Sequence, residues 1–264
     1  MTITALAATP ILSLMMLLTA DLVPAQVRFS KGQNIAPVFE GWKKNGDGSI
    51  VMYFGYLNRN YEEELDIPIG PNNTFEPGGD RGQPTHFLPR RHRFLFQVPI
   101  PKDWDKQRRL VWTLTVNGKT EKANGWLQPE WEVDEGVIQM NIGPGGAPPV
   151  DPPNTAPTIS GSPIQTVTLP NTTTVTARAT DDGVPKPRPG AAQARNQGLY
   201  VRWIHYRGPG KVTFGTPMSE RVIGAPVEAS TTVRFSAPGT YVLRAIASDG
   251  LLESVHDVTV TVKE

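Results

Sequence analysis

The sequence predicts an all-β protein, in which two β-sandwich domains in tandem are joined by a Pro/Gly-rich linker. Short segments with the two-residue alternation of β-strands recur along the chain, and Gly, Pro and Asn turn signals separate them. No segment shows a convincing helical period. Residues 143–157 (GPGGAPPVDPPNTAP) are almost entirely Gly, Pro, Ala and small polar residues, a composition typical of a semi-rigid spacer. We therefore expect one sandwich over 35–142 and a second over 158–264.

Length, charge and cysteine content narrow the function classes. The chain has 264 residues, so each half has about 110, a usual size for a sandwich domain that buries its own core. The formal net charge of +1 gives no indication of a nucleic-acid partner. The chain has no Cys, which excludes disulfides and thiolate metal sites but not export.

Residues 1–25 have the features of a secretory signal peptide. Residues 1–20 carry no charged side chain, and Ile11–Ala20 is strongly apolar. Val23 and Ala25 occupy the −3 and −1 positions of a cleavage site. The alternative is an uncleaved membrane anchor, although the apolar run is short for a span of about 20 residues. We expect an exported protein of the periplasm, the cell surface or the extracellular space, with no membrane span after cleavage.

The first half alternates strand signals with turns. The strongest turn signal is Asn117-Gly118, which predicts a type I′ hairpin because both central residues of that turn need positive φ. Pro68 confines the weakest strand to an edge or a strand end. The expected strands are Pro37–Lys44, Ser49–Leu57, Glu63–Ile69, Arg93–Ile100, Arg109–Val116 and Lys119–Trp126.

A long insert, residues 70–90, interrupts this rhythm. Its Pro, Gly and Asn content disfavours regular structure, and a loop of this length is either functional or disordered. The phrases YFGY (53–56), IPIGPNN (67–73) and DRGQPTHF (80–87) resemble an N-terminal module of secreted and surface proteins of bacteria. That resemblance implies fold class and location, and no activity.

The second half has cleaner strand signals, and their number and spacing are typical of an immunoglobulin-like sandwich. Trp203 lies in the middle of the third run, where such a sandwich buries a large aromatic side chain. Tyr241 follows a Pro-Gly-Thr turn, the position of a tyrosine corner. The expected strands are Gln165–Leu169, Thr173–Thr180, Leu199–Tyr206, Lys211–Phe214, Ser230–Phe235, Gly239–Ala247 and Ser254–Val262.

Four blocks of the second half carry a more specific resemblance. They are ATDDGVPKP (179–187), VRW (201–203), GPGKVTF (208–214) and FSAPGTYVLRAIASDGLLESVHDVTVTV (235–262). Together they resemble a PKD-like module, the immunoglobulin-like repeat of bacterial surface proteins and animal ectodomains, over about 154–264. The WDFGDG-type signature of the narrower PKD family is missing. The resemblance implies a spacer or adhesive role.

No motif points to a catalytic centre. The four His residues show no HExxH spacing, and nucleophile elbows, P-loops and dinucleotide fingerprints are absent. His86 and His92 could converge near Asp80, although solvated loop positions are the simpler interpretation. No carboxylate pair is singled out for glycoside hydrolysis, so we assign no catalytic residue.

Four aspartates form a candidate calcium site. In an immunoglobulin-like sandwich, the N-terminus and the loops after the second and sixth strands meet at one pole. Those elements carry Asp151, Asp181, Asp182 and Asp249, and clustered oxygen ligands suit Ca²⁺. The alternative is ordinary turn chemistry, in which each Asp accepts hydrogen bonds from its own backbone.

Three tryptophans are candidate ligand-binding residues. Trp104, Trp126 and Trp131 lie near strand ends or loops, where sugars stack on exposed rings, whereas Trp42, Trp112 and Trp203 fall in strands and are expected in the core. Isolated exposed aromatic residues need no function, so the observation leaves both interpretations open.

The sequence thus predicts an exported, non-catalytic binding or structural protein, an adhesion or spacer unit whose linker holds two rigid sandwiches end to end. Its partner would be a protein or a polysaccharide at the cell surface. A carbohydrate-binding accessory protein is the alternative, and a hydrolase comes third.

Overall fold

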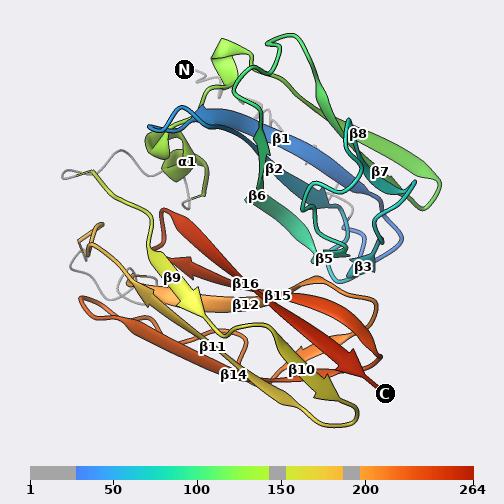
Figure 1. Cartoon of the computed structure of the whole chain (residues 1–264), viewed down its shortest axis with the longest axis vertical. Coiled ribbons are helices and arrows are strands. Elements are labelled where there is room, and N and C mark those ends of the chain that lie inside the picture. Colours follow the sequence, from blue (N-terminus) through green and yellow to red (C-terminus); the bar gives the residue numbers. More distant parts are fainter. Residues whose placement is uncertain (1–27, 143–152, 187–196) are drawn as a thin grey trace, which may run out of the picture.

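The computed structural model describes residues 28–142, 153–186 and 197–264. The signal-like segment 1–25, most of the linker and Asp151 lie outside the described residues. The all-β prediction is confirmed, because the described part consists of strands β1 to β16 with one short helix, α1 (Glu135–Ile142), and a 3₁₀ turn, η1 (Pro129–Trp131). Figure 1 shows the two halves as separate groups of sheets.

The first half is a sandwich of two antiparallel three-stranded sheets, ordered β1-β2-β6 and β4-β7-β8, with a small β3-β5 ribbon. Aromatic rings fill the space between the sheets, where Phe54 and Phe75 meet edge to face and Phe75 stacks on Trp112. The strands are β1 (Ile35–Lys44), β2 (Ile50–Asn58), β3 (Leu65–Asp66), β4 (Asn73–Glu76), β5 (His86–Phe87), β6 (Arg90–Ile100), β7 (Leu110–Val116) and β8 (Lys119–Gly125).

Local chemistry explains the β7–β8 hairpin. Asn117 and Gly118 adopt φ values of 50° and 73°, as the predicted type I′ turn requires. Alternate residues of β7 are buried, which matches its sequence LVWTLTV.

Three expectations for the first half need correction. The strand expected over Glu63–Ile69 shrinks to Leu65–Asp66, next to Pro68. The insert 70–90 contains β4 and β5, because it pairs with β7 and β3 instead of standing alone. A helix, α1, is present after all: Asp134 caps it by accepting a hydrogen bond from the Val137 N–H at 2.8 Å, and Ile138 is buried.

The second half has immunoglobulin-like topology. One sheet is ordered β13-β14-β11-β9 and the other β10-β16-β15-β12, with β10 parallel to β16. These orders correspond to the two sheets of an immunoglobulin constant-type domain, with its first strand divided between them. The strands are β9 (Thr158–Gly161), β10 (Gln165–Thr168), β11 (Thr173–Thr180), β12 (Tyr200–Arg207), β13 (Val212–Phe214), β14 (Val227–Phe235), β15 (Gly239–Ser248) and β16 (Glu253–Lys263).

Both structural markers of this fold lie where the sequence placed them. Trp203 is buried on β12, in the core between the two sheets. The Tyr241 hydroxyl donates a hydrogen bond to the Ala237 carbonyl at 2.8 Å, which is a tyrosine corner.

The two halves pack against each other instead of lying end to end. The β10-β16-β15-β12 sheet turns its outer face toward the first half (Figure 1), and Ile204, Tyr206 and Ile246 join the apolar core of the first half. Leu252 packs beside Ile138 of α1. These contacts form an apolar seal between two sandwiches that were predicted to be independent. The seal consists of Ile204, Tyr206, Ile246 and Leu252 against the first half.

Candidate functional site

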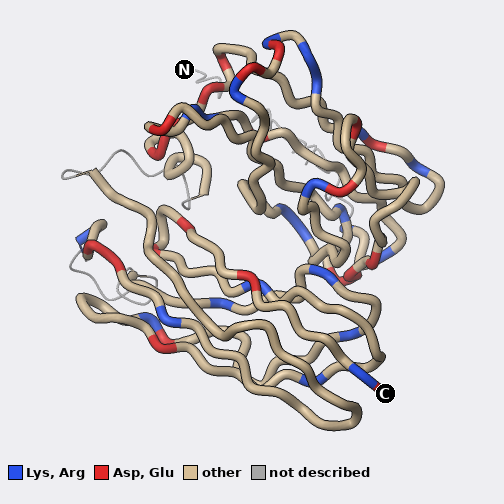
Figure 2. Tube along the Cα trace, in the orientation of Figure 1, with Lys and Arg blue, Asp and Glu red and all other residues tan. Residues whose placement is uncertain are grey.

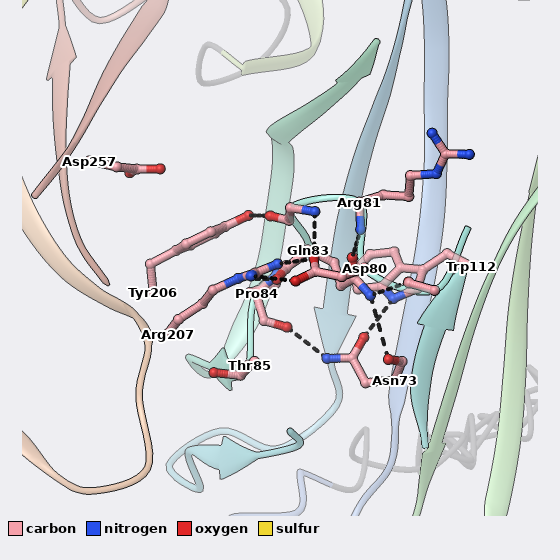
Figure 3. A network of polar contacts seen from close by, with 12 residues as sticks. Asn73, Asp80, Arg81, Gln83, Pro84, Thr85, Trp112, Tyr206, Arg207 and Asp257 are labelled. Carbon is pink, nitrogen blue, oxygen red and sulfur yellow. Dashed lines mark hydrogen bonds and ion pairs between the residues drawn. The ribbon is translucent and has the colours of Figure 1, made fainter. Parts of the chain in front are cut away.

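The described contacts between the halves concentrate on the segment 80–88 of the insert and on strands β12 and β15. Two fully buried amide side chains organise this segment (Figure 3). Asn73 donates to the Ile67 and Pro84 carbonyls at 2.9 and 2.8 Å, and it accepts the Trp112 indole N–H at 3.0 Å. Gln83 accepts the Arg81 N–H at 2.7 Å. The insert therefore presents an ordered surface to the second half.

Strand β12 contacts this surface through its last residues. The Tyr206 hydroxyl donates to the Gly82 carbonyl at 2.5 Å, and the Thr85 N–H donates to the Tyr206 carbonyl at 3.1 Å. Arg207 forms a two-pronged ion pair with Asp80, at 3.0 and 2.7 Å, and also donates to the Gln83 carbonyl. This pairing holds the pKa of Asp80 below its usual value.

A second contact centres on Arg244 of β15, whose side chain is 6% exposed. Its guanidinium forms two hydrogen bonds with Asp257, at 2.7 and 2.8 Å, and donates a third to the Leu95 carbonyl of the first half. The same group lies 3.5 Å from the Tyr206 ring centroid. One cation therefore serves an ion pair, a backbone acceptor and an aromatic ring, each from a different element.

A cluster of His and acidic residues lies at the edge of this interface. His86 of β5 and His205 of β12 stack with ring centroids 4.2 Å apart. His86 Nδ1 lies 2.7 Å from Asp66 Oδ1, and its Nε2 lies 3.2 Å from Glu64 Oε2. One ligand atom each from Asp66, His86 and His205 fall within 4.8 Å of one another. The cluster lines a groove of about 530 Å³, together with Glu62, Trp203 and Lys211.

His205 is 5% exposed, and neither of its ring nitrogens makes a hydrogen bond of good geometry with a described residue, although the Arg207 backbone lies close enough to oppose the fall of its pKa. Burial, with His86 close by, lowers the pKa of His205 to about 4, so the ring is neutral at pH 7 and one nitrogen carries a lone pair. An unpaired buried polar group costs about 1–3 kcal/mol. A water molecule or an ion bound at a His205 ring nitrogen would remove this cost.

The remaining His expectations are corrected by the same geometry. His86 and His92 do not converge on Asp80, and neither is a solvated loop residue. His92 stacks on Tyr56 at 4.8 Å between ring centroids, and burial lowers its pKa to about 4. Asp80 pairs with Arg207 instead.

The aspartates predicted to bind calcium lie at one pole of the second sandwich, apart from Asp151, which is outside the described residues. Asp249 is buried and accepts hydrogen bonds from Leu251 N–H and Leu252 N–H through Oδ1 and from Asn154 through Oδ2. The Asp182 carboxylate accepts from the Thr155 N–H and hydroxyl. Local turn bonds, together with bonds from Asn154 and Thr155 of the segment before β9, therefore occupy much of their hydrogen-bonding capacity.

Asp181 differs from its neighbours. Its Oδ2 accepts the Gly183 N–H at 3.0 Å, whereas its Oδ1 is buried without a partner in the described part of the chain. Burial, and then the charges of Asp249 and Asp182, raise the pKa of Asp181 to about 6. Such a repelled carboxylate is what a cation would relieve, and calcium binding here stays a prediction.

Two of the three candidate tryptophans share a groove of about 840 Å³ on the first half. Trp126 is half-buried there, Trp104 is almost fully buried, and Trp42, expected in the core, is half-buried and also lines the groove. Lys44, Lys102, Lys106, Gln107, Gln128 and Glu132 supply its polar groups. The rim thus carries more positive than negative charge.

Trp131 does not line this groove. It stacks on Phe39 with centroids 5.6 Å apart and stays 44% exposed. Of the tryptophans expected in the core, Trp112 and Trp203 are buried there. The prediction that Trp104, Trp126 and Trp131 bind carbohydrate is untested, and the groove supports it for Trp104 and Trp126 only.

The interface between the halves was not predicted from the sequence, although β15 carried a signal. Along this strand Leu243, Ala245 and Ala247 face the core of their own sandwich, whereas Ile246 faces the first half. A strand with apolar residues on both faces is typical of burial on both sides. The pairing of Asp66 and His86 with His205 left no such signal, because it depends on packing between distant segments.

The comparisons with known proteins find structural alignments of low TM-score only. No protein-family model matches the chain, and a search of curated protein sequences finds no match. Among solved structures, domains 4 and 5 of the S-layer protein SbsC align over 60% of this chain and 66% of that one, with 13% identity and a TM-score of 0.29. The D00-D0 domain of intimin aligns over 86% and 100%, with 9% identity and a TM-score of 0.27. A chimeric titin Z1Z2-Z1Z2 tandem also aligns over 86% and 100%, with 14% identity and a TM-score of 0.24.

Among the helices in the described part of the chain, none has the length and apolar character of a membrane span.

Proposed function

We propose that this chain is a non-catalytic structural or binding protein of a bacterial cell surface or extracellular space, in which two sandwiches form one rigid unit. The observation that supports it best is the seal between the halves. Apolar residues of β12 and β15 complete the core of the first half, while Tyr206, Arg207 and Arg244 satisfy its backbone carbonyls. Such a seal suits a protein that transmits force or fixes the position of its outer loops.

The architecture supports a structural or binding role better than a catalytic one. The His residues closest to carboxylates sit in the interface, and His86 has both ring nitrogens beside a carboxylate. Lys/Arg and Asp/Glu are interspersed over both halves (Figure 2). The signal-like segment 1–25 supports the proposal that the chain is exported. The partner class we propose is a protein or a polysaccharide at the cell surface.

Rigidity can be tested directly, because the chain has no Cys and two introduced thiols are the only labelling sites. We suggest spin labels at the exposed positions Lys119 and Arg234, one in each half, through K119C and R234C. A single narrow distance distribution is expected, whereas a broad one would contradict a rigid pair. Secretion and surface labelling of the full chain test the location, and turnover abolished by a single carboxylate or His change would contradict the non-catalytic assignment.

A carbohydrate-binding accessory role is the second candidate, and the tryptophan groove favours it. Its half-buried Trp126 and its lysines suit a glycan that stacks on rings and carries negative charge. One face of Trp126 is covered by Arg109, 4.6 Å from the ring centroid, so a sugar would use the other face.

The exposed Trp131 provides the control for this role. In a polysaccharide pull-down, Trp126→Ala is expected to lose retention while Trp131→Ala, outside the groove, keeps it. No retention of the unmodified chain on any acidic or neutral polysaccharide would exclude the role.

A further inference from the structure

We propose that Asp66, His86 and His205 form a site for a divalent transition metal, with Zn²⁺ as the expected ion, that ties the first half of the chain to the second. Asp66 and His86 belong to the β3-β5 ribbon of the first half, whereas His205 belongs to β12 of the second. A metal held by all three would bridge the interface.

The donor set matches the metal class. Imidazole nitrogens and a carboxylate oxygen are typical Zn²⁺ ligands, and a neutral imidazole is the form that binds metal. The two His side chains are 8% and 5% exposed, so they are already largely desolvated. Two further carboxylates, Glu62 and Glu64, line the same groove and attract cations.

His205 supplies the second and independent observation. Both of its nitrogens are buried and lack a well-placed hydrogen-bond partner among the described residues, while the ring lines the same groove as Asp66 and His86. Structural imidazoles normally have at least one partner when buried. A metal ion gives His205 that partner.

Glu64 fits the outer part of such a site. Metal-bound His residues usually give their second nitrogen to a carboxylate, which fixes the ring. With Asp66 and His86 Nδ1 directed at the ion, Glu64 at 3.2 Å from His86 Nε2 takes this role. A water completes the tetrahedron.

Closing the site requires the two imidazole rings to turn, because they now stack with centroids 4.2 Å apart and planes 24° apart, and their in-plane lone pairs do not converge on one point. Tetrahedral Zn²⁺ with bonds of about 2.0–2.1 Å places its ligand atoms about 3.3 Å apart. The three candidate atoms lie within 4.8 Å of one another, and His86 Nδ1 and Asp66 Oδ1 are 2.7 Å apart. Asp66 is 51% exposed, so its side chain can turn to open the short distance, whereas the two rings must unstack to close the longer ones.

Cobalt provides the spectroscopic test. Titration of the untagged, EDTA-treated full chain with Co²⁺ is expected to give the intense visible bands of a tetrahedral site at one ion per chain, and Zn²⁺ should remove them. His205→Gln and His86→Gln are expected to weaken Zn²⁺ binding by at least about 100-fold, and Glu64→Gln by about tenfold. His256→Gln, which changes a His outside the cluster, should leave binding unchanged.

Asp66→Asn keeps the test valid if the His variants fail to fold, because this half-exposed side chain carries no core packing. It should also weaken binding by about 100-fold. Absence of tetrahedral bands, or bands that survive these substitutions, would overturn the metal site.

Hydrogen exchange tests separately whether the metal bridges the two halves. The amides of Thr85 and Gly208 donate hydrogen bonds across the interface, at 3.1 and 3.2 Å. Zn²⁺ should slow their hydrogen exchange in the unmodified chain but not in His205→Gln, and unchanged exchange would overturn bridging. Amides that are protected without metal, in a chain that binds none, would refute the site and leave the rigid pair of sandwiches intact.

Discussion

Gly208 lies where the second half approaches both its own tyrosine corner and the first half. Its φ of 148° is rarely adopted by other residues, and a Cβ at this position would overlap the Tyr241 ring. Its N–H donates to the Thr85 hydroxyl across the interface. The packing of one ring therefore dictates the absence of a side chain at this position.

Gly208→Ala is expected to destabilise the chain by about 2–4 kcal/mol, because the added methyl group must displace a buried ring in a strained backbone. Gly183→Ala is the matched control: Gly183 also has a positive φ, 77°, but its Cβ would meet open space. The control should lose only about 1 kcal/mol. Urea unfolding measures both, and equal losses would show that the overlap with Tyr241 is relieved at no cost.

Arg244 differs from Gly208 because its side chain is needed: it is a buried charge that its hydrogen-bond partners stabilise. Arg244→Leu should lower the free energy of unfolding by about 2–3 kcal/mol, because it leaves the Leu95 carbonyl without its donor and Asp257 without its cation. Arg178→Leu removes a surface pair with Glu228, both side chains more than half exposed, and should change stability by less than about 0.5 kcal/mol. Equal effects on thermal unfolding would show that the interface contact contributes nothing.

Among the elements, the loops at the pole of the second sandwich bring carboxylates close enough to repel one another. The pKa of Asp181 is raised to about 6, so the folded chain holds a proton that the unfolded chain has released above its ordinary value near 3.8. Between these two pH values the folded state binds more protons. Stability therefore falls as pH rises from about 4 to about 6 and is level above.

Asp181→Asn is expected to flatten this part of the pH profile and to raise the unfolding midpoint at pH 7. Thermal melts of both proteins across pH 4–7 measure the difference. A profile for Asp181→Asn that keeps the same fall would assign the pH dependence to other groups.

The calcium hypothesis adds a condition to the same experiment. Ca²⁺ should raise the melting temperature of the unmodified chain at pH 7, EDTA should lower it, and Asp181→Asn should remove both effects. A melt unchanged by Ca²⁺ would leave Asp181, Asp182 and Asp249 with turn chemistry alone.

The elements also show what the sequence could reveal. The Asn117-Gly118 hairpin, the alternation of β7 and the Tyr241 corner were predictable because each depends on residues close in sequence. The strand β4 was missed because its partner, β7, lies far along the chain, and a Pro- and Gly-rich segment gains strand geometry only through that pairing. Helix α1 was missed because its eight residues are too few to show a period.

The candidate site was predictable only in pieces. The acidic pole followed from loop order alone, since Asp181 and Asp249 lie at equivalent ends of the sandwich. The metal cluster did not, because His86 and His205 meet only when the two halves dock, and no local pattern in either segment encodes the other.

At the scale of the whole molecule, the alternation of β15 links two cores. Leu243 and Ala245 pack inside the second sandwich, while Ile246 enters the core of the first. Arg244, on the same outward face, bonds the Leu95 carbonyl. Unfolding of either half therefore exposes apolar surface and unpaired polar groups of the other, which couples their stabilities.

We therefore expect the two halves to unfold in a single transition, and Ile246→Asp to split it into two. The substitution buries a charge in the interface and should remove about 2–4 kcal/mol of coupling, yet it spares the second core because the side chain points away from it. Val255→Asp is the control: Val255 pairs with Ile246 on the neighbouring strand but is 47% exposed, so its variant should keep one transition. Differential scanning calorimetry separates the cases. Two transitions in the unmodified chain would mean that the seal contributes too little free energy to couple the sandwiches, and the rigid unit would then need the proposed metal to hold it.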